Sequence, residues 1–276
     1  MEPSDRYGSR GWASPFLDQE CLKRVAFILI AALAVSACAV AARPSQTEPL
    51  LVAAAASLET AFSELGAAYT DQTGQAVEFA FGSSGNLATQ IQNGAPFDVY
   101  ASADEAYVDQ LVTQGYVLPE TQAVYAQGKL VLVVNIASDL QVGSIEDLAD
   151  ARISRVAIAN PDVAPYGMAA KQVLEASGLW DMVAPKIVQG ANVRQALQYV
   201  QTGDAPVGLV ALSIADVPEV RYTVVDASLY EPLNQAIAVV SSTDRESTAR
   251  SFVDFVLGSA GQAILAKHGF TTPGSP

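Results

Sequence analysis

The sequence predicts an α/β protein with two lobes, each built around a mainly parallel sheet that helices flank. From Leu50 onward, apolar runs of strand length alternate with segments in which apolar residues recur at helical spacing. Such alternation is typical of strands joined by helical crossovers, which form parallel sheets covered on both faces. Half of the 276 residues are apolar, which is enough for a substantial core.

The alternating strands and helices form two blocks, and the pattern at the end of the chain resembles that of the first block. The first block predicts strands at 50–56, 76–81, 97–101 and 129–135 and helices at 58–70, 87–92 and 105–114. The second predicts strands at 155–159, 186–189 and 207–211 and helices at 168–177 and 193–202. The tail predicts a strand at 235–241 and helices at 247–257 and 261–268.

A chain that returns in this way crosses between its lobes twice. We expect the crossings near Asn135 and Leu233. The first lobe then comprises 50–134 with the returning part 234–276, and the second lobe comprises 135–233.

The N-terminal segment reads as a targeting signal. Lys23 and Arg24 precede a short apolar run at 25–34, which ends in Val35-Ser36-Ala37-Cys38. Small residues before a cysteine at this distance resemble the bacterial lipobox, so we expect cleavage before Cys38 and its lipidation. Residues 1–37 are then an N-terminal extension with a signal peptide, and 38–49 are the lipidated cysteine and a tether. The mature protein would lie outside the cytoplasm, anchored by lipid at the cell surface or the periplasmic face of the cytoplasmic membrane.

Charge and cysteine content exclude several functions. The formal net charge is −14, and four basic and four acidic residues lie before Cys38, so the rest carries the whole excess. An acidic body without a basic stripe repels nucleic acid. One histidine, His268, and no free cysteine in the mature chain provide no metal-ligand cluster.

Four strand-to-helix junctions place small or polar residues at helix starts. They are 55–58 (AASL), 82–86 (GSSGN), 164–167 (APYG) and 191–195 (ANVRQ). Ser57 is predicted as an N-cap, Pro165 fits a first helical position, and Asn192 with Gln195 has the form of a capping box. Helix N-termini leave N–H groups unpaired at the positive end of the macrodipole, so two junctions from each lobe could surround a small anion with neutral donors.

From Leu50 to Pro273 the chain resembles the periplasmic molybdate/tungstate-binding proteins of ABC importers. The matching segments are 54–58 (AAASL), 81–91 (FGSSGNLATQI), 94–104 (GAPFDVYASAD), 161–167 (PDVAPYG), 193–197 (VRQAL), 205–210 (APVGLV) and 267–270 (KHGF). Each segment alone is weakly specific, but together they cover nearly the whole mature chain.

The resemblance implies a type II periplasmic-binding-protein fold that closes around one oxyanion in the cleft between its lobes. It also implies a monomer without cofactor or catalysis that docks onto a permease driven by a cytoplasmic ATPase. The implied ligands are the hydroxyl and N–H groups of Ser57 and Ser84 and the N–H groups of Tyr166 and Val193.

One position departs from the family pattern. Many members supply a tyrosine hydroxyl just after the Gly-Leu-Val strand, and this chain has Ala211 there. An unpartnered ligand oxygen would cost about 1–3 kcal/mol. We hypothesise that the Tyr166 side chain, the Asn192 amide, Ser213 or a water replaces the missing donor.

Alternative functions remain open at this point. The same fold could bind sulfate, phosphate or an organic acid. The two serine junctions favour an oxyanion over an amino acid, whose carboxylate Arg194 could meet, although Arg194 is interpreted as a surface residue on the first helical turn. Asp104 and Asp162, which could meet a protonated phosphate, are interpreted as solvated or capping acids.

A serine hydrolase would need a base such as His268 or Lys171 near a serine, but the sequence has no G-x-S-x-G or S-x-x-K motif at Ser57 or Ser84. An iron-binding member of the fold would usually show adjacent tyrosines, which are absent.

Overall fold

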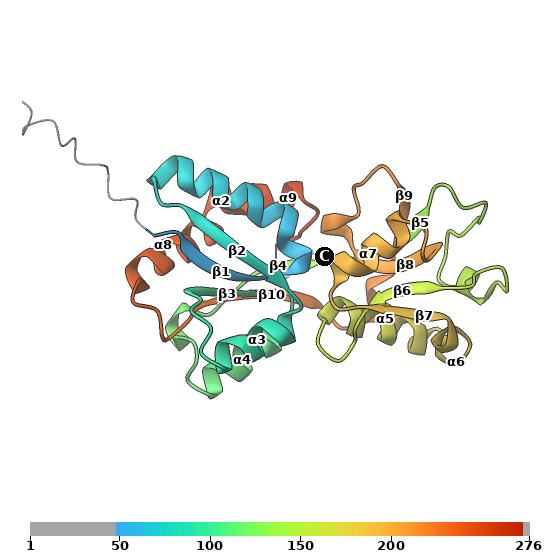
Figure 1. Cartoon of the computed structure of the whole chain (residues 1–276), viewed down its shortest axis with the longest axis horizontal. Coiled ribbons are helices and arrows are strands. Elements are labelled where there is room, and N and C mark those ends of the chain that lie inside the picture. Colours follow the sequence, from blue (N-terminus) through green and yellow to red (C-terminus); the bar gives the residue numbers. More distant parts are fainter. Residues whose placement is uncertain (1–47, 273–276) are drawn as a thin grey trace, which may run out of the picture. The chain divides into compact units, whose positions relative to one another are not determined.

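The computed structural model describes residues 48–272, which fold around two five-stranded sheets (Figure 1). The predicted signal peptide, Cys38 and nearly all of the tether lie outside the described residues. Within 48–272, no helix is both long enough and apolar enough to cross a bilayer.

The first sheet has the strand order β2-β1-β3-β10-β4. Its strands are β1 (Leu50–Ala55), β2 (Val77–Gly82), β3 (Val99–Ser102), β4 (Ala123–Gly128) and β10 (Leu233–Val239). β1 runs parallel to β2 and β3, whereas β10 runs antiparallel to β3 and β4. Five helices accompany this sheet: α2 (Glu59–Thr73), α3 (Ser84–Gln92), α4 (Glu105–Thr113), α8 (Glu246–Leu257) and α9 (Ser259–Lys267).

Alternation along β1 explains why helices cover both faces of the first sheet. Val52 and Ala54 belong to the core cluster that contains Phe62 of α2 and Phe252 of α8. Ala53, on the opposite face, belongs to a second cluster with residues of α3 and α4. Successive side chains of a strand point to opposite faces, so a strand that is buried on both sides is apolar throughout.

The second sheet has the order β7-β6-β8-β5-β9. Its strands are β5 (Leu130–Asn135), β6 (Val156–Ala159), β7 (Ile187–Gly190), β8 (Val207–Ala211) and β9 (Val220–Val224). β6 runs parallel to β7 and β8, and β5 runs antiparallel to β8 and β9. The α-helices here are α5 (Pro165–Ala176), α6 (Trp180–Val183) and α7 (Val193–Gln201).

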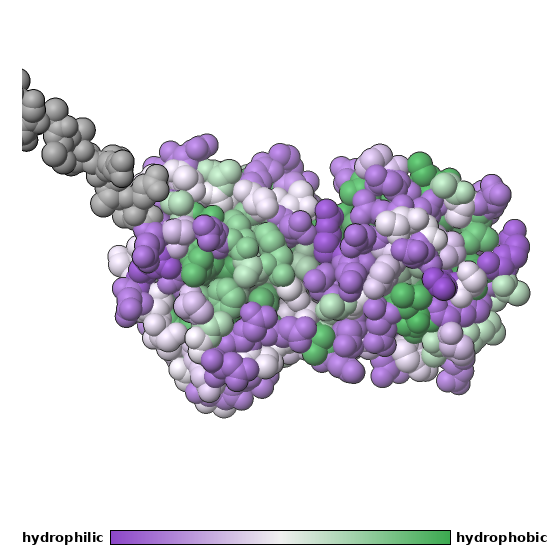
Figure 2. All heavy atoms as spheres, in the orientation of Figure 1, coloured by the Kyte–Doolittle hydropathy of each residue, from purple (hydrophilic) through white to green (hydrophobic). Residues whose placement is uncertain are grey.

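Short 3-10 helices connect several of these elements. They are η1 (Ala56–Leu58), η2 (Pro119–Thr121), η3 (Glu146–Ala149), η4 (Ala184–Lys186), η5 (Leu212–Ile214) and η6 (Ala227–Leu229). In the view of Figure 2, hydrophilic residues cover most of the surface, and apolar residues gather over β1 and β2. The latter agrees with the partial exposure of β2, which is an edge strand.

The two-lobed α/β fold is confirmed, but the crossing predicted near Asn135 is wrong. β5 pairs only with strands of the second sheet, so the chain leaves the first sheet at Gly128 and enters the second at Leu130. β5 is buried along its whole length, and a uniformly apolar strand does not reveal which sheet contains it. The return passage lies between Val224 and Leu233.

Each sheet is mixed because β5 and β10 enter directly from the other sheet. A parallel neighbour needs a crossover of a dozen or more residues, and a strand that arrives without one can pair antiparallel. The strands β4 and β9 were not among the predicted elements. Both lie at sheet edges, where the pattern is less apolar than in the central strands.

Gly128, the last residue of β4, leaves no room for a side chain. A Cβ built there would lie 2.0 Å from the Tyr166 hydroxyl oxygen. We expect Gly128→Ala to lower the free energy of unfolding by about 1–3 kcal/mol through overpacking, measured by urea denaturation. Adding Tyr166→Phe should recover part of the loss. Gly143→Ala is the matched control, because nothing lies within 4 Å of its Cβ position; equal losses in the two alanine variants would contradict the steric explanation.

Candidate functional site

The four junctions predicted from the sequence meet around one small cavity. It leaves about 10 Å³ for the centre of a water-sized sphere, which is roughly the room that one bound water molecule needs. Two junctions come from each sheet. The twelve lining residues are Ala55, Ala56, Ser57, Gly82, Ser83, Ser84, Ala103, Ala164, Pro165, Tyr166, Asn192 and Val193.

Ser57 lies on the wall that follows β1, but not as a helix cap. It is the middle residue of η1, and Leu58 is the N-cap of α2 without a side-chain hydrogen bond. The N-cap prediction is therefore wrong, because a 3-10 turn precedes the α-helix. The Ser57 hydroxyl is buried and has no hydrogen-bond partner among residues 48–272. It is left free to act as a donor at the cavity.

Two adjacent serines form the next wall, where β2 leads into α3. The Ser84 Oγ accepts a hydrogen bond from the Ala103 N–H at 3.0 Å, which leaves the Ser84 proton free to donate. The Tyr100 hydroxyl donates to the Ser84 carbonyl at 2.8 Å and fixes the first turn of α3. Ser83 is the N-cap, but its buried hydroxyl caps nothing and is unpartnered within the described part of the chain.

Ser83 was missed by the sequence reasoning. The signal that could have found it is the second hydroxyl in the same Gly82-Ser83-Ser84 junction. The sequence does not show that the Ser83 hydroxyl makes no capping hydrogen bond to α3, because this depends on the backbone conformation at the helix start.

The second sheet contributes the starts of α5 and α7. Pro165 is the first residue of α5, as predicted, and Tyr166 follows it. Asn192 caps α7, and its Oδ1 accepts from the Gln195 N–H at 3.0 Å, which confirms that half of the capping box. The Gln195 Oε1 accepts from Ala191 rather than from Asn192. The first N–H groups of a helix have no acceptor within it, so those of Tyr166 and Val193 are available.

The cavity holds no charged side chain. Its lining consists of hydroxyls, one carboxamide, apolar groups and helix N-termini. Such a site offers donors to an acceptor-rich anion and lacks a carboxylate that would repel it. No lysine, histidine or acidic residue is among the residues that line it beside the serines.

Comparison with known proteins agrees with this geometry. Residues 50–271 match the family model described as bacterial extracellular solute-binding protein. The chain belongs to this family.

Its relatives include the molybdate-binding protein ModA of Rhodobacter capsulatus, which is 35% identical over 84% of this chain and 91% of that protein. The putative ABC transporter substrate-binding lipoprotein YvgL of Bacillus subtilis is 32% identical over 80% of this chain and 86% of its own length. The solved structure of the Azotobacter vinelandii periplasmic molybdate-binding protein superimposes with a TM-score of 0.77 and 35% identity, and covers 81% of this chain and 99% of that one.

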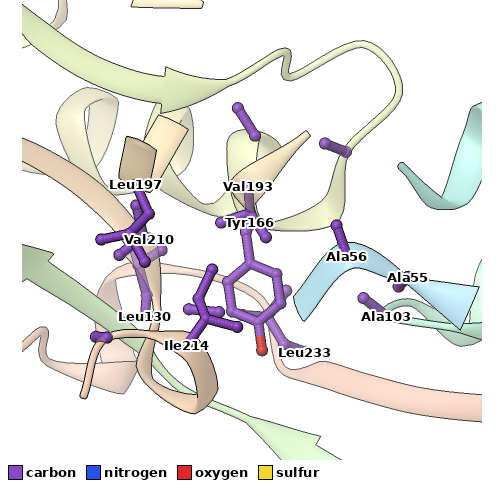
Figure 3. Packing of buried hydrophobic residues seen from close by; sticks show 14 of the residues in the cluster. Ala55, Ala56, Ala103, Leu130, Tyr166, Val193, Leu197, Val210, Ile214 and Leu233 are labelled. Carbon is purple, nitrogen blue, oxygen red and sulfur yellow. The ribbon is translucent and has the colours of Figure 1, made fainter. Parts of the chain in front are cut away.

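The Tyr166 side chain of this solute-binding protein is buried between Gly128, at the end of β4, and the Ser57 side chain, which partly offsets the effect of burial on the Tyr166 pKa. In Figure 3 the Tyr166 hydroxyl is directed toward Leu233, which pairs with Gly128 across β10 and β4. The hydroxyl is buried and lacks a partner in the described residues. Burial raises the pKa of Tyr166 well above its usual value, so the phenol stays neutral and keeps its proton.

The Ser213 hydroxyl, which we considered as a replacement for the missing ligand donor, makes a hydrogen bond within the protein. It lies in η5 after β8, and its hydroxyl donates to the Ser57 carbonyl at 2.7 Å. The Ser213 proton therefore takes part in a buried hydrogen bond between η5 and η1. Ala211 ends β8 and is fully buried.

The residues considered for catalysis or metal binding are not brought to the cavity. The His268 Nε2 lies 2.7 Å from the Glu64 Oε2, and Lys171 pairs with Glu175 at 3.7 Å. Neither lines the cavity. In the part of the chain that the structure describes, no three His, Cys, Asp or Glu side chains are grouped for a metal ion.

Two buried tyrosines near the site differ in their hydrogen bonds, which gives a matched test of the geometry. Tyr166→Phe removes a hydroxyl without a partner, so we expect the unfolding free energy to stay within about 0.5 kcal/mol or to rise. Tyr100→Phe removes the bond to the Ser84 carbonyl, and we expect a loss of about 1 kcal/mol. Both are measured by urea denaturation of the anion-free protein; a loss of more than about 1 kcal/mol for Tyr166→Phe would show that its hydroxyl has a partner in solution.

Proposed function

We propose that this chain captures molybdate or tungstate outside the cytoplasm and delivers it to the permease of an ABC importer. The observation that carries the proposal is the small uncharged cavity lined by serine hydroxyls and helix N-termini from both sheets. The relatives named as molybdate-binding proteins in Rhodobacter capsulatus and Azotobacter vinelandii support the choice of ligand.

The ligand set follows from the donors at the cavity. A fully deprotonated tetrahedral oxyanion presents only acceptors, so every contact must come from a donor. We assign the hydroxyl and N–H groups of Ser57 and Ser84 from the first sheet's side, and the N–H groups of Tyr166 and Val193 from the other. Hydrogen bonds to a charged group contribute about 1.5–3 kcal/mol each, so several together offset the desolvation of a dianion.

Two further donors are candidates to replace the tyrosine hydroxyl that Ala211 does not provide. The Asn192 carboxamide lines the cavity, and its Oδ1 is used as a cap while its Nδ2 remains a donor. Ser83 supplies a buried hydroxyl at the same wall as Ser84. Ser213 is a weaker candidate, because its proton is already donated to the Ser57 carbonyl. The Tyr166 hydroxyl is buried, has no partner in the described residues and lies near the Ser57 side chain, so it remains a candidate.

We expect other oxyanions to bind less well at this cavity. Phosphate keeps a proton near neutral pH and needs an acceptor, but no carboxylate lines the cavity. Asp104 instead caps α4 by accepting from the Ala106 N–H at 2.9 Å. Sulfate is smaller than molybdate, and we expect a ligand shell spaced for longer metal–oxygen bonds to leave the sulfate contacts too long for good hydrogen bonds.

We further propose that the mature protein is a monomeric lipoprotein without catalytic activity, anchored through Cys38. The lipobox-like segment and the similarity to the lipoprotein YvgL support the anchor. The uncharged cavity, which offers no general base, supports binding without turnover.

Thermal melting of the anion-free protein tests the ligand assignment. We expect large upward shifts with molybdate and tungstate and little change with sulfate, phosphate or citrate. A ligand at about 1,000 times its dissociation constant stabilises by about 4 kcal/mol, and each kcal/mol moves the midpoint by about 2–4 °C for a domain of this size. A shift with sulfate alone, or displacement of molybdate by equimolar sulfate, would reassign the ligand; no shift with any oxyanion would refute the proposal.

Substitutions at the cavity test the individual donors. Ser84→Ala removes one charge-assisted hydrogen bond, and we expect molybdate affinity to fall about 10- to 100-fold by isothermal titration. Asn192→Asp keeps an oxygen that caps α7 but places a carboxylate beside the anion, and we expect a larger loss.

Ser251→Ala on α8 is the control for these substitutions, because this exposed serine lies outside the cavity. Unchanged affinity in the Ser84 variant would remove that serine from the ligand set. An Asn192→Asp variant that binds as well as the original would place the carboxamide away from the ligand.

A further inference from the structure

Three polar contacts among residues 48–272 join the two sides of the cavity. The Gly85 N–H donates to the Val163 carbonyl at 2.9 Å, and the Ser213 hydroxyl donates to the Ser57 carbonyl at 2.7 Å. The third contact joins two side chains: the Arg194 Nε lies 3.3 Å from the Glu59 Oε2. Glu59 begins α2 beside the first sheet, and Arg194 lies in the first turn of α7 beside the second.

The Glu59–Arg194 pair lies at the mouth of the cavity. A surface hollow that leaves about 320 Å³ for the centre of a water-sized sphere is lined by both residues. Ala56 and Asn192 line this hollow and the cavity alike, so the two are adjacent. Opening this side of the cavity requires the two side chains to separate.

The position of Arg194 is unfavourable without a partner. A cation in the first turn of a helix meets the positive end of the macrodipole. α7 contains no acidic residue that could pair with it along the helix. Glu59 lies in the first turn of α2, where the helix dipole favours a carboxylate, but without a partner its charge would repel an incoming dianion near the cavity. Each charge is neutralised by the other only when the two sides of the cavity are together.

We propose that Glu59 and Arg194 form a latch across the mouth of the cavity that slows release of the bound oxyanion. This inference rests on the proposed function and adds the residues that control how long the ligand is retained. The latch acts on the closed arrangement, since the pair exists only when α2 and α7 approach each other. Its main effect is therefore on the dissociation rate.

The exposure of the pair sets the size of the effect. The side chains of Arg194 and Glu59 are 40% and 36% exposed, so water and salt weaken their attraction. We expect loss of the pair to speed release about two- to fivefold, and the difference to shrink as ionic strength rises.

A double-mutant cycle on the full chain tests the latch. The protein is loaded with radiolabelled molybdate, and release into excess unlabelled molybdate is followed by rapid filtration. Four forms are compared: the original chain, Glu59→Gln, Arg194→Gln and the double variant. Because each substitution also changes the charge near the anion, the decisive quantity is the coupling between them. We expect Arg194→Gln to speed release in the original background and to change it much less when Glu59 is already Gln.

Matched controls separate the latch from general charge effects. Lys171 and Glu175 form an ion pair within α5 with similar exposure, and neither lines the cavity or the hollow. The corresponding cycle at this pair should leave the release rate unchanged. Melting of the anion-free variants shows whether each one is folded.

The outcomes distinguish this inference from the proposed function. Coupling of about twofold or more between Glu59 and Arg194, lost at high salt, supports the latch. Additive effects of the two substitutions would overturn it, even with molybdate tightly held. Failure of the original chain to retain molybdate would instead refute the proposed function.

Discussion

The unpaired N–H groups at helix starts are the feature on which the site depends. In each sheet, parallel strands lead at their carboxyl ends into helices, so these starts gather at one edge of the sheet. The starts of α3, α5 and α7, together with η1, then surround one cavity. A helix start that is buried needs a partner for its donors, and an anion is the partner that also suits the dipole.

Neutral donors let an acidic protein hold an anion. The formal net charge of −14 is distributed over the surface, where water and salt screen it within about 8–10 Å. The cavity wall carries no carboxylate, so local hydrogen bonds outweigh the distant field. A lysine in the wall would bind anions less selectively, because a flexible point charge imposes less geometry than fixed N–H and hydroxyl groups.

The two sides of the cavity are coupled through residues that serve both the wall and the connections between the sheets. Tyr166 lines the cavity, while the hydroxyl end of its ring reaches Gly128, where the chain passes from one sheet to the other. The Ser213 hydroxyl joins η5 to the carbonyl of Ser57, a residue that lines the cavity. A change in the angle between the sheets would therefore move donors on both walls, which links binding to closure.

The sequence by itself determined the class of fold, the four junctions and the chemistry of the cavity, because each depends on local periodicity and on residues a few positions apart. Helix and strand positions agreed closely for the central elements, and the cap of α7 followed from Asn192 and Gln195 alone. Tertiary structure decided which sheet contains β5, because the uniformly apolar sequence of a fully buried strand does not indicate which strands pair with it. Tertiary structure also decided which serine hydroxyls have a hydrogen-bond partner. Ser57 lies in a 3-10 turn and Ser83 caps no helix, whereas the Ser213 hydroxyl donates to the Ser57 carbonyl. The pairing of Glu59 with Arg194 depended on the approach of two helices, because the two residues lie 135 positions apart (194 − 59) and no local sequence pattern encodes their contact.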